Sequence, residues 1–158
     1  MCRDSIHHLS RRPDSSADEG TPPVGGKRSY RPVGDLTKSF HDNAEFCAIY
    51  LRGVQSFSDL DAVSKLRFSS FLNRFFKNFQ AMFFSHRDGV LSASLWGEVE
   101  RTMSDVIAYP GVQQWWQTRK HWHTEEFSRV IDAIIARGDK PTAYSTYNLN
   151  EAGLPKDI

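Results

Sequence analysis

The sequence predicts an all-α fold, a compact bundle of about five helices with a central Phe-rich helix, flanked by disordered N- and C-terminal tails. Between residues 35 and 138, apolar residues recur at helical spacing in five segments. This stretch holds 17 of the 20 aromatic residues, which is enough for a substantial core. No segment alternates apolar and polar residues over a useful length, so no strand is expected.

The central helix is predicted over Leu66–His86. At about 100° per residue its apolar side chains fall within an arc of about 140°, and its basic and amide side chains lie on the other side. A helix of this length extends roughly 30 Å. The expected core face consists of Phe68, Phe71, Leu72, Phe75, Phe76, Phe79, Met82, Phe83 and His86. Leu66 and Phe84 lie on the opposite side, where they are either exposed or covered by a second layer.

The first two helices have recognisable start and stop signals. The first is expected to begin at residues 41–43, capped by Asp42 or Asn43, and to end at Gly53 in the left-handed C′ position. The second helix, which contains the Phe-rich stretch, is expected to begin at the S-x-x-D pattern of residues 58–61 and to end near Gly89.

Three further helices complete the predicted bundle. The third covers residues 93–108 with Ser92 as its cap, and its apolar face runs from Leu95 to residue 107. Pro110 is expected to stop it, because proline cannot continue a helix. A short fourth helix covers residues 112–120, and a fifth begins after Thr124 or His123 and ends near residue 138.

Both ends of the chain read as tails. Residues 1–34 hold four of the seven prolines, four glycines and only isolated apolar residues, so they cannot bury enough surface to offset the entropy of ordering. A basic docking arm is the weaker alternative for this tail. Residues 139–158 are polar and aperiodic and read as a loosely ordered tail, in which residues 142–147 either stay loose or lie along the bundle.

Composition excludes several classes of function. The formal net charge is +1, so no overall field favours nucleic acid or anionic lipid, and no nucleic-acid partner is expected. No segment is apolar enough over about 20 residues for a transmembrane span, and residues 1–16 lack a secretory signal. Cys2 and Cys47 do not form a disulfide framework, which indicates a reducing cytoplasm.

Known motifs for chemistry are missing. His121 and His123 flank Trp122, but zinc needs at least three protein ligands, and no further ligand has suitable spacing. No glutamate has a histidine three residues later, as di-iron bundles require. Residues 25–29 lack the first glycine of a phosphate-binding loop. We therefore expect no catalytic residue, cofactor or metal. Trp115, Trp116 and Trp122 either form a partner-binding or membrane-interface patch or, as is more usual, close one end of the bundle.

The run from residue 42 to residue 132 resembles a group of uncharacterised bacterial helical-domain proteins. The resemblance is specific as a combination of short motifs, although each motif alone is weak. These motifs are N-x-E-F from Asn43, L-R-G to Gly53, R-F at Arg67, F-x-N-F before H-R at His86, G-x-L with L-W to Trp96, P-G-x-x-x-W-W from Pro110, and F-x-x-x-I-D from Phe127.

The resemblance implies a helical domain and no established activity. Many members look like a membrane helix followed by this domain, whereas here a Pro- and Gly-rich segment occupies that place, so membrane attachment is not carried over. Bacterial origin follows from the resemblance alone.

Two hypotheses about function follow. The first is a non-catalytic protein-interaction or signalling module, with another protein as its partner and no enzyme activity. The second is a small-molecule binder or enzyme with a site at the rim formed by His86, Arg87, Trp96 and Trp116. We prefer the first because no catalytic partner for His86 can be identified.

Overall fold

The computed structural model describes residues 38, 40 and 43–147, and it is helical with no strand within them. The helices are α2 (Ala44–Gln55), α3 (Ala62–Arg87), α4 (Ala93–Ile107), α5 (Pro110–Arg119), the 3-10 turn η1 (Lys120–Trp122) and α6 (Glu125–Ala136). This confirms the all-α class and the five-helix bundle. The predicted N-terminal tail lies outside the described residues.

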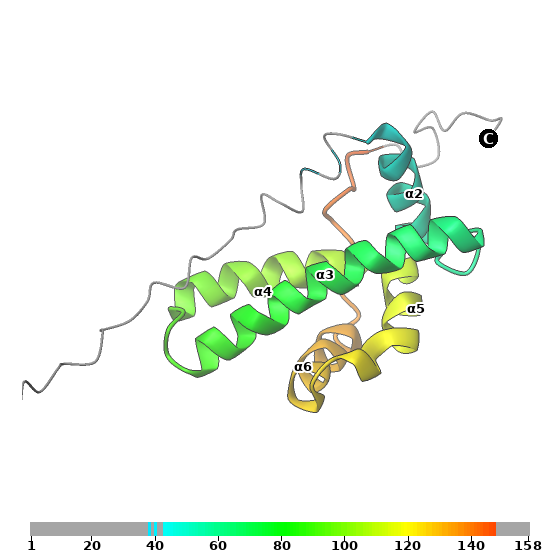
Figure 1. The fold of residues 1–158 in the computed structure, drawn as a ribbon. Coiled ribbons are helices and arrows are strands. Elements are labelled where there is room, and N and C mark those ends of the chain that lie inside the picture. The colour runs from blue at the N-terminus through cyan, green and yellow to red at the C-terminus, as the bar shows by residue number, and fades with distance from the viewer. Residues whose placement is uncertain (1–37, 39, 41–42, 148–158) are drawn as a thin grey trace, which may run out of the picture. The chain divides into compact units, whose positions relative to one another are not determined.

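The helix α3 is the longest element, with 26 residues, and the others pack along it. Figure 1 shows α4 running back beside α3 after a turn at Gly89, whose φ of 74° requires glycine. The helix α2 lies at the N-terminal end of α3, and it packs against both α3 and α5. The helix α6 packs against α4. The bundle is therefore organised around α3: α2 and α4 pack directly against it, and α5 and α6 pack against α2 or α4.

The helices α2 and α5 cross at two glycines. A Cβ atom built on Gly111 would lie 1.8 Å from the carbonyl oxygen of Gly53, and one built on Gly53 would lie 2.5 Å from the ring of Phe68. Both distances are far below van der Waals contact. Glycine at position 111 lets the backbones of α2 and α5 touch, and glycine at position 53 leaves room for the ring of Phe68 on α3. Val54 and Val112 beside them are fully buried.

The prediction that Gly53 ends the first helix is wrong. The helix continues to Gln55, and Ser56 forms the C-cap by donating its N–H to the carbonyl of Arg52. The L-R-G pattern resembles the end of a helix. Here, however, the glycine lies inside α2 and allows neighbouring helices to pack closely against it. The cap at the start was correctly expected, since Asn43 accepts from the N–H of Phe46 at 2.9 Å.

Two other predicted boundaries need correction. The helix α3 begins at Ala62, and its N-cap is Asp61, which accepts from two backbone N–H groups, in place of Ser58. Pro110 stops α4 as expected, but it is also the first residue of α5, which therefore starts two residues earlier than predicted. Proline suits this first position because its missing N–H has no partner there in any helix.

The predicted Phe-rich face is the core. Seven of its nine residues are buried, and Phe83 and His86 at the C-terminal end are half-buried. Trp115 and Trp116 are both 0% exposed, which rules out the partner-binding or membrane-interface patch for these two residues. They stack on Phe76, with ring centroids 5.4 Å and 5.3 Å away. The aromatic core therefore extends across α3 and α5.

The two residues on the opposite side of α3 take different environments. Leu66 is 68% exposed. Phe84 is half-buried beside Phe83, and the guanidinium of Arg87 lies 4.6 Å from the centre of its ring. A cation above the ring shields it from water without a second layer of helices.

The C-terminal segment up to residue 147 lies along the bundle, the second of the two alternatives left open by the sequence. The backbone N–H of Tyr144 donates to the hydroxyl of Tyr109 at 2.8 Å, and the hydroxyls of Tyr50 and Tyr144 are 2.9 Å apart. Thr142 donates to Asp105 at 2.6 Å. These bonds connect the segment to α2 and α4.

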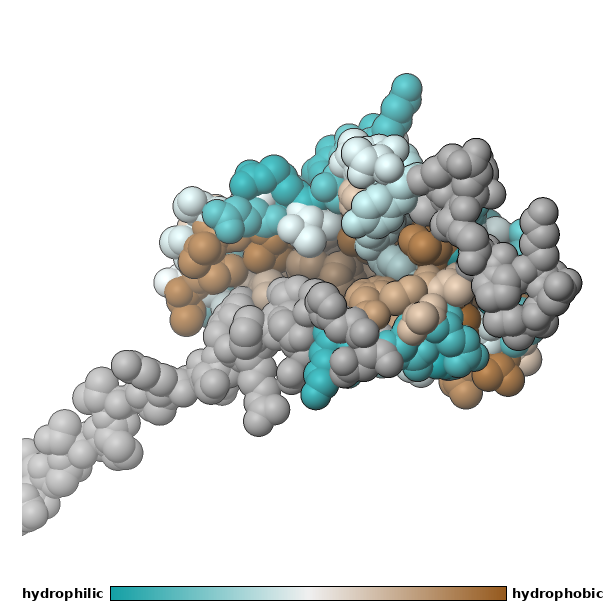
Figure 2. Space-filling view, turned by 90° about the horizontal axis from the view of Figure 1, so that it is seen from above, coloured by the Kyte–Doolittle hydropathy of each residue, from teal (hydrophilic) through white to brown (hydrophobic). Residues whose placement is uncertain are grey.

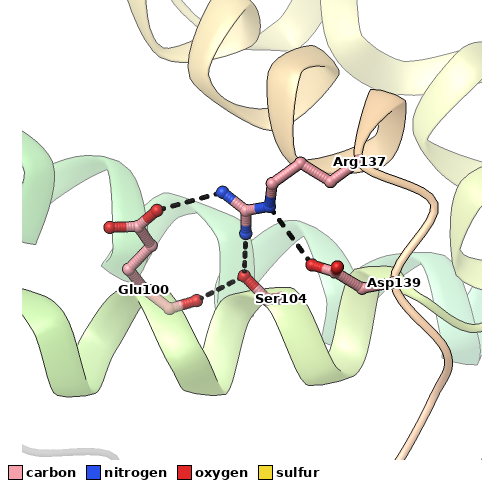
Figure 3. A network of polar contacts seen from close by, with 4 residues as sticks. All are labelled: Glu100, Ser104, Arg137 and Asp139. Carbon is pink, nitrogen blue, oxygen red and sulfur yellow. Dashed lines mark hydrogen bonds and ion pairs between the residues drawn. The ribbon is translucent and has the colours of Figure 1, made fainter.

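Arg137 directs the chain into this segment (Figure 3). Its guanidinium donates to Glu100 at 3.2 Å, to Ser104 at 2.7 Å and to Asp139 at 3.2 Å. Ser104 in turn donates to the carbonyl of Glu100 at 2.8 Å. The arginine side chain is 45% exposed, so these bonds orient α6 on α4 and contribute little stability.

We predict that Gly111→Ala destabilises the domain by about 3 kcal/mol or more, because the new methyl group meets backbone atoms that cannot move aside. Gly97→Ala is the matched control. A Cβ atom there meets only Arg101 at 3.5 Å, so this variant should be unchanged or more stable by up to about 1 kcal/mol. Urea unfolding followed by circular dichroism measures both. Equal stability of the two variants would contradict the glycine crossing.

Candidate functional site

His86 and Trp96, two residues of the predicted rim, do meet. Their rings stack with centroids 5.3 Å apart and an angle of 4° between planes. The Nδ1–H of His86 donates to the carbonyl of Leu91 at 3.1 Å, which closes the turn between α3 and α4. Trp96 also packs against Phe83, 5.9 Å away. The stack therefore fastens the hairpin of α3 and α4.

Arg87 points away from the histidine–tryptophan stack and toward α6. Its guanidinium pairs with Asp88 at 2.9 Å and with Glu126 at 3.0 Å. Its side chain is 48% exposed, so these two ion pairs are solvated and contribute little to the stability of the fold. The neighbouring carboxylates raise the pKa of Arg87, which is charged in any case.

Trp116 does not reach the surface where the other three residues lie. It is fully buried, and its Nε1–H donates to Asp132 at 2.9 Å. Phe127 lies between it and Phe83, at 6.3 Å and 6.0 Å from their respective rings. The four residues of the predicted rim thus do not line one site, and each has a contact that the fold itself needs.

His123 is the most perturbed histidine of the described residues. It is half-buried against Phe76, Trp116 and Phe127, with ring centroids 5.2 to 6.2 Å away. Its Nδ1–H donates to Gln80 at 3.3 Å, and its Nε2 is buried with no partner. Burial, and second the charge of Lys77, lower the pKa of His123 to about 4. The ring is therefore neutral near pH 7.

Sites for small ligands or metals have little support among the described residues. A recess between α4, α5 and α6 is too small to hold a water-sized molecule. No group of three or more His, Cys, Asp or Glu residues in this part of the chain is placed to hold a metal ion. None of the helices described is long and apolar enough to cross a membrane.

The turn between α3 and α4 exposes an apolar surface. Val90 is 82% exposed and Leu95 is 49% exposed, beside the half-buried Leu91 and Trp96. Figure 2 shows apolar residues gathered at the left end of the molecule, over this hairpin. We call Val90, Leu91 and Leu95 the hairpin surface. The prediction that Leu95 belongs to the buried face of α4 is wrong, because its side chain, in the first turn of that helix, is 49% exposed.

Comparisons with protein-family models, with curated proteins and with solved structures find no match for this chain. The resemblance to uncharacterised bacterial helical proteins therefore stays a prediction.

We predict that the free energy of unfolding falls by about 1 to 2 kcal/mol as the pH drops from about 6.5 to about 4, because of His123. Its pKa is lowered on folding, so the unfolded chain binds the proton more readily in this range. The full stabilisation is present above pH 6.5. Urea unfolding at a series of pH values measures it.

The variant His123→Phe isolates this contribution from the carboxylates that also titrate. It keeps a ring of similar size in the aromatic cluster, and its pH slope should be shallower than that of the wild type. Identical slopes in the two proteins would contradict the assignment.

Proposed function

We propose that this domain is a non-catalytic protein-interaction module, and that it binds its partner through the hairpin surface. The observation that supports this most strongly is the exposure of Val90 and Leu95 at the same end of the molecule. Apolar side chains that gather at a surface mark interaction sites more often than single exposed ones. The His86–Trp96 stack and the glycine turn hold this end in a fixed shape.

The proposed occupant is an apolar groove or face on another protein. The exposed acids Asp88 and Glu98 lie close to the hairpin surface in the sequence, and Asp88 and Glu126 both pair with Arg87. Acidic side chains at its edge disfavour an anionic membrane and suit a protein with basic residues beside its groove. The neutral overall charge leaves nucleic acid out of this proposal.

The contacts of the predicted rim favour this function over a small-molecule binder or enzyme. A catalytic histidine needs an acid or nucleophile within hydrogen-bond reach, and His86 donates to a backbone carbonyl. Trp116 has no open face for a ligand. A cytoplasmic location is part of the proposal, and the free thiol of Cys47 is compatible with it.

We predict that Val90→Asp abolishes capture of the partner without unfolding the domain, because its side chain is 82% exposed. A photoreactive phenylalanine analogue placed at position 90 in cells of the native host should crosslink one dominant protein. The control is the same analogue at position 63, near the start of α3, where Val63 is 66% exposed.

The crosslinked protein counts as the partner only when binding is reproduced with purified components. Wild type should then bind it at least about tenfold more tightly than Val90→Asp or Leu95→Asp, and Val63→Asp should bind like the wild type. A purified partner that binds all four proteins equally would contradict the hairpin surface as the site.

A further inference from the structure

Charge is unevenly distributed over the helices, although the whole chain is almost neutral. The elements α3, α5 and η1 contain seven basic residues and no acidic one. All the acidic residues within the described helices are therefore on α2, α4 and α6. The seven basic residues are Lys65, Arg67, Arg74, Lys77, Arg87, Arg119 and Lys120.

Some of these basic residues are neutralised by neighbours, and two near η1 are not. Carboxylates pair with Arg67, Arg87 and Lys120. In contrast, Lys77 donates to the carbonyl of Trp122, and Arg119 donates to the carbonyl of its neighbour Thr118. Within the part of the chain that the structure describes, no ion pair involves either of the two.

Both cations adjoin an exposed tryptophan. Trp122 is 44% exposed, and the guanidinium of Arg119 lies 4.9 Å from the centre of its ring. The exposed His121 packs against the same indole, with ring centroids 5.9 Å apart. Lys77 reaches the tryptophan backbone from α3. We call Lys77, Arg119, His121 and Trp122 the Trp122 surface.

Two buried polar atoms on the helices beside it also have no hydrogen-bond partner. They are Oδ1 of Asn73 on α3 and Nε of Arg119 on α5. A buried polar atom without a partner costs free energy. Both atoms are closed to solvent, so neither is available to a ligand bound at this surface.

We propose that the Trp122 surface binds an acidic peptide segment of a protein. A carboxylate pairs with Lys77 or Arg119, and an apolar side chain next to it covers the indole of Trp122. Tryptophan and arginine at the centre of a contact are the residue types that contribute most to binding. This site is separate from the hairpin surface, and the inference does not depend on the function proposed above.

The small number of cations favours a peptide over nucleic acid. A DNA-binding protein commonly neutralises six to ten phosphates, whereas this surface offers two cations without acidic partners. One exposed indole provides one stacking platform, less than a single strand bound at several bases needs. Two carboxylates and one apolar side chain match the groups available.

The test is fluorescence anisotropy with a labelled peptide of about twelve residues, composed of glutamate and aspartate with one central leucine. The full chain should bind it, and binding should weaken as salt rises from about 50 mM to about 200 mM. Both Trp122→Ala and Lys77→Glu should weaken binding at least about tenfold, with unchanged melting temperatures. A lysine peptide of the same length should not bind.

Matched controls separate this site from general charge effects and from the hairpin surface. Arg129→Glu changes an exposed arginine on α6, and Val90→Asp changes the hairpin, so both should bind the acidic peptide like the wild type. Absence of binding by the wild type, or binding that Trp122→Ala leaves unchanged, would overturn the proposal. Tighter binding of an oligothymidine or of phosphatidylserine vesicles than of the peptide would overturn it as well.

Discussion

The direct contact between the backbones of α2 and α5 is the constraint on which the rest of the domain depends. With Gly111 against the carbonyl of Gly53, the start of α5 is fixed at the N-terminal part of α3. Trp115 and Trp116 then enter the core one turn later and stack on Phe76. A side chain at Gly111 would push α5 away from α2, and one at Gly53 would displace the ring of Phe68 on α3, so either change would disturb the aromatic core.

The polar ends of the large aromatic residues fix how that core is arranged. Trp115 donates to Ser69, Trp116 donates to Asp132, and each bond joins α5 to a different helix. Burial raises the pKa of Tyr50, whose hydroxyl meets that of Tyr144. Phe side chains alone would tolerate several packings, whereas each of these bonds is satisfied in only one, so the polar groups select a single arrangement.

The sequence predicted much of what depends on local pattern, although it placed the cap of α3 at Ser58 in place of Asp61. The period of the Phe-rich helix identified its buried face, and the caps at Asn43, Ser92 and Thr124 were readable because capping involves residues three apart. Contacts between distant segments left no such signal. Gly53 looked like a helix stop because the groups that pack against it, Phe68 and Gly111, lie on other helices. Trp116 was placed at a rim because nothing local shows that Phe127 covers it.

A net charge of +1 for the whole chain conceals how unevenly charge is distributed among the helices. Binding responds to the charges within about 10 Å, and at that range the basic and acidic helices present different surfaces. The fold itself produces this segregation, because α3 and α5 share the aromatic core and place their polar residues on the adjoining outer faces. Trp122 follows α5 immediately, so the glycine crossing that fixes α5 also determines which cations surround this indole. The position of the Trp122 surface therefore follows from how the core is built.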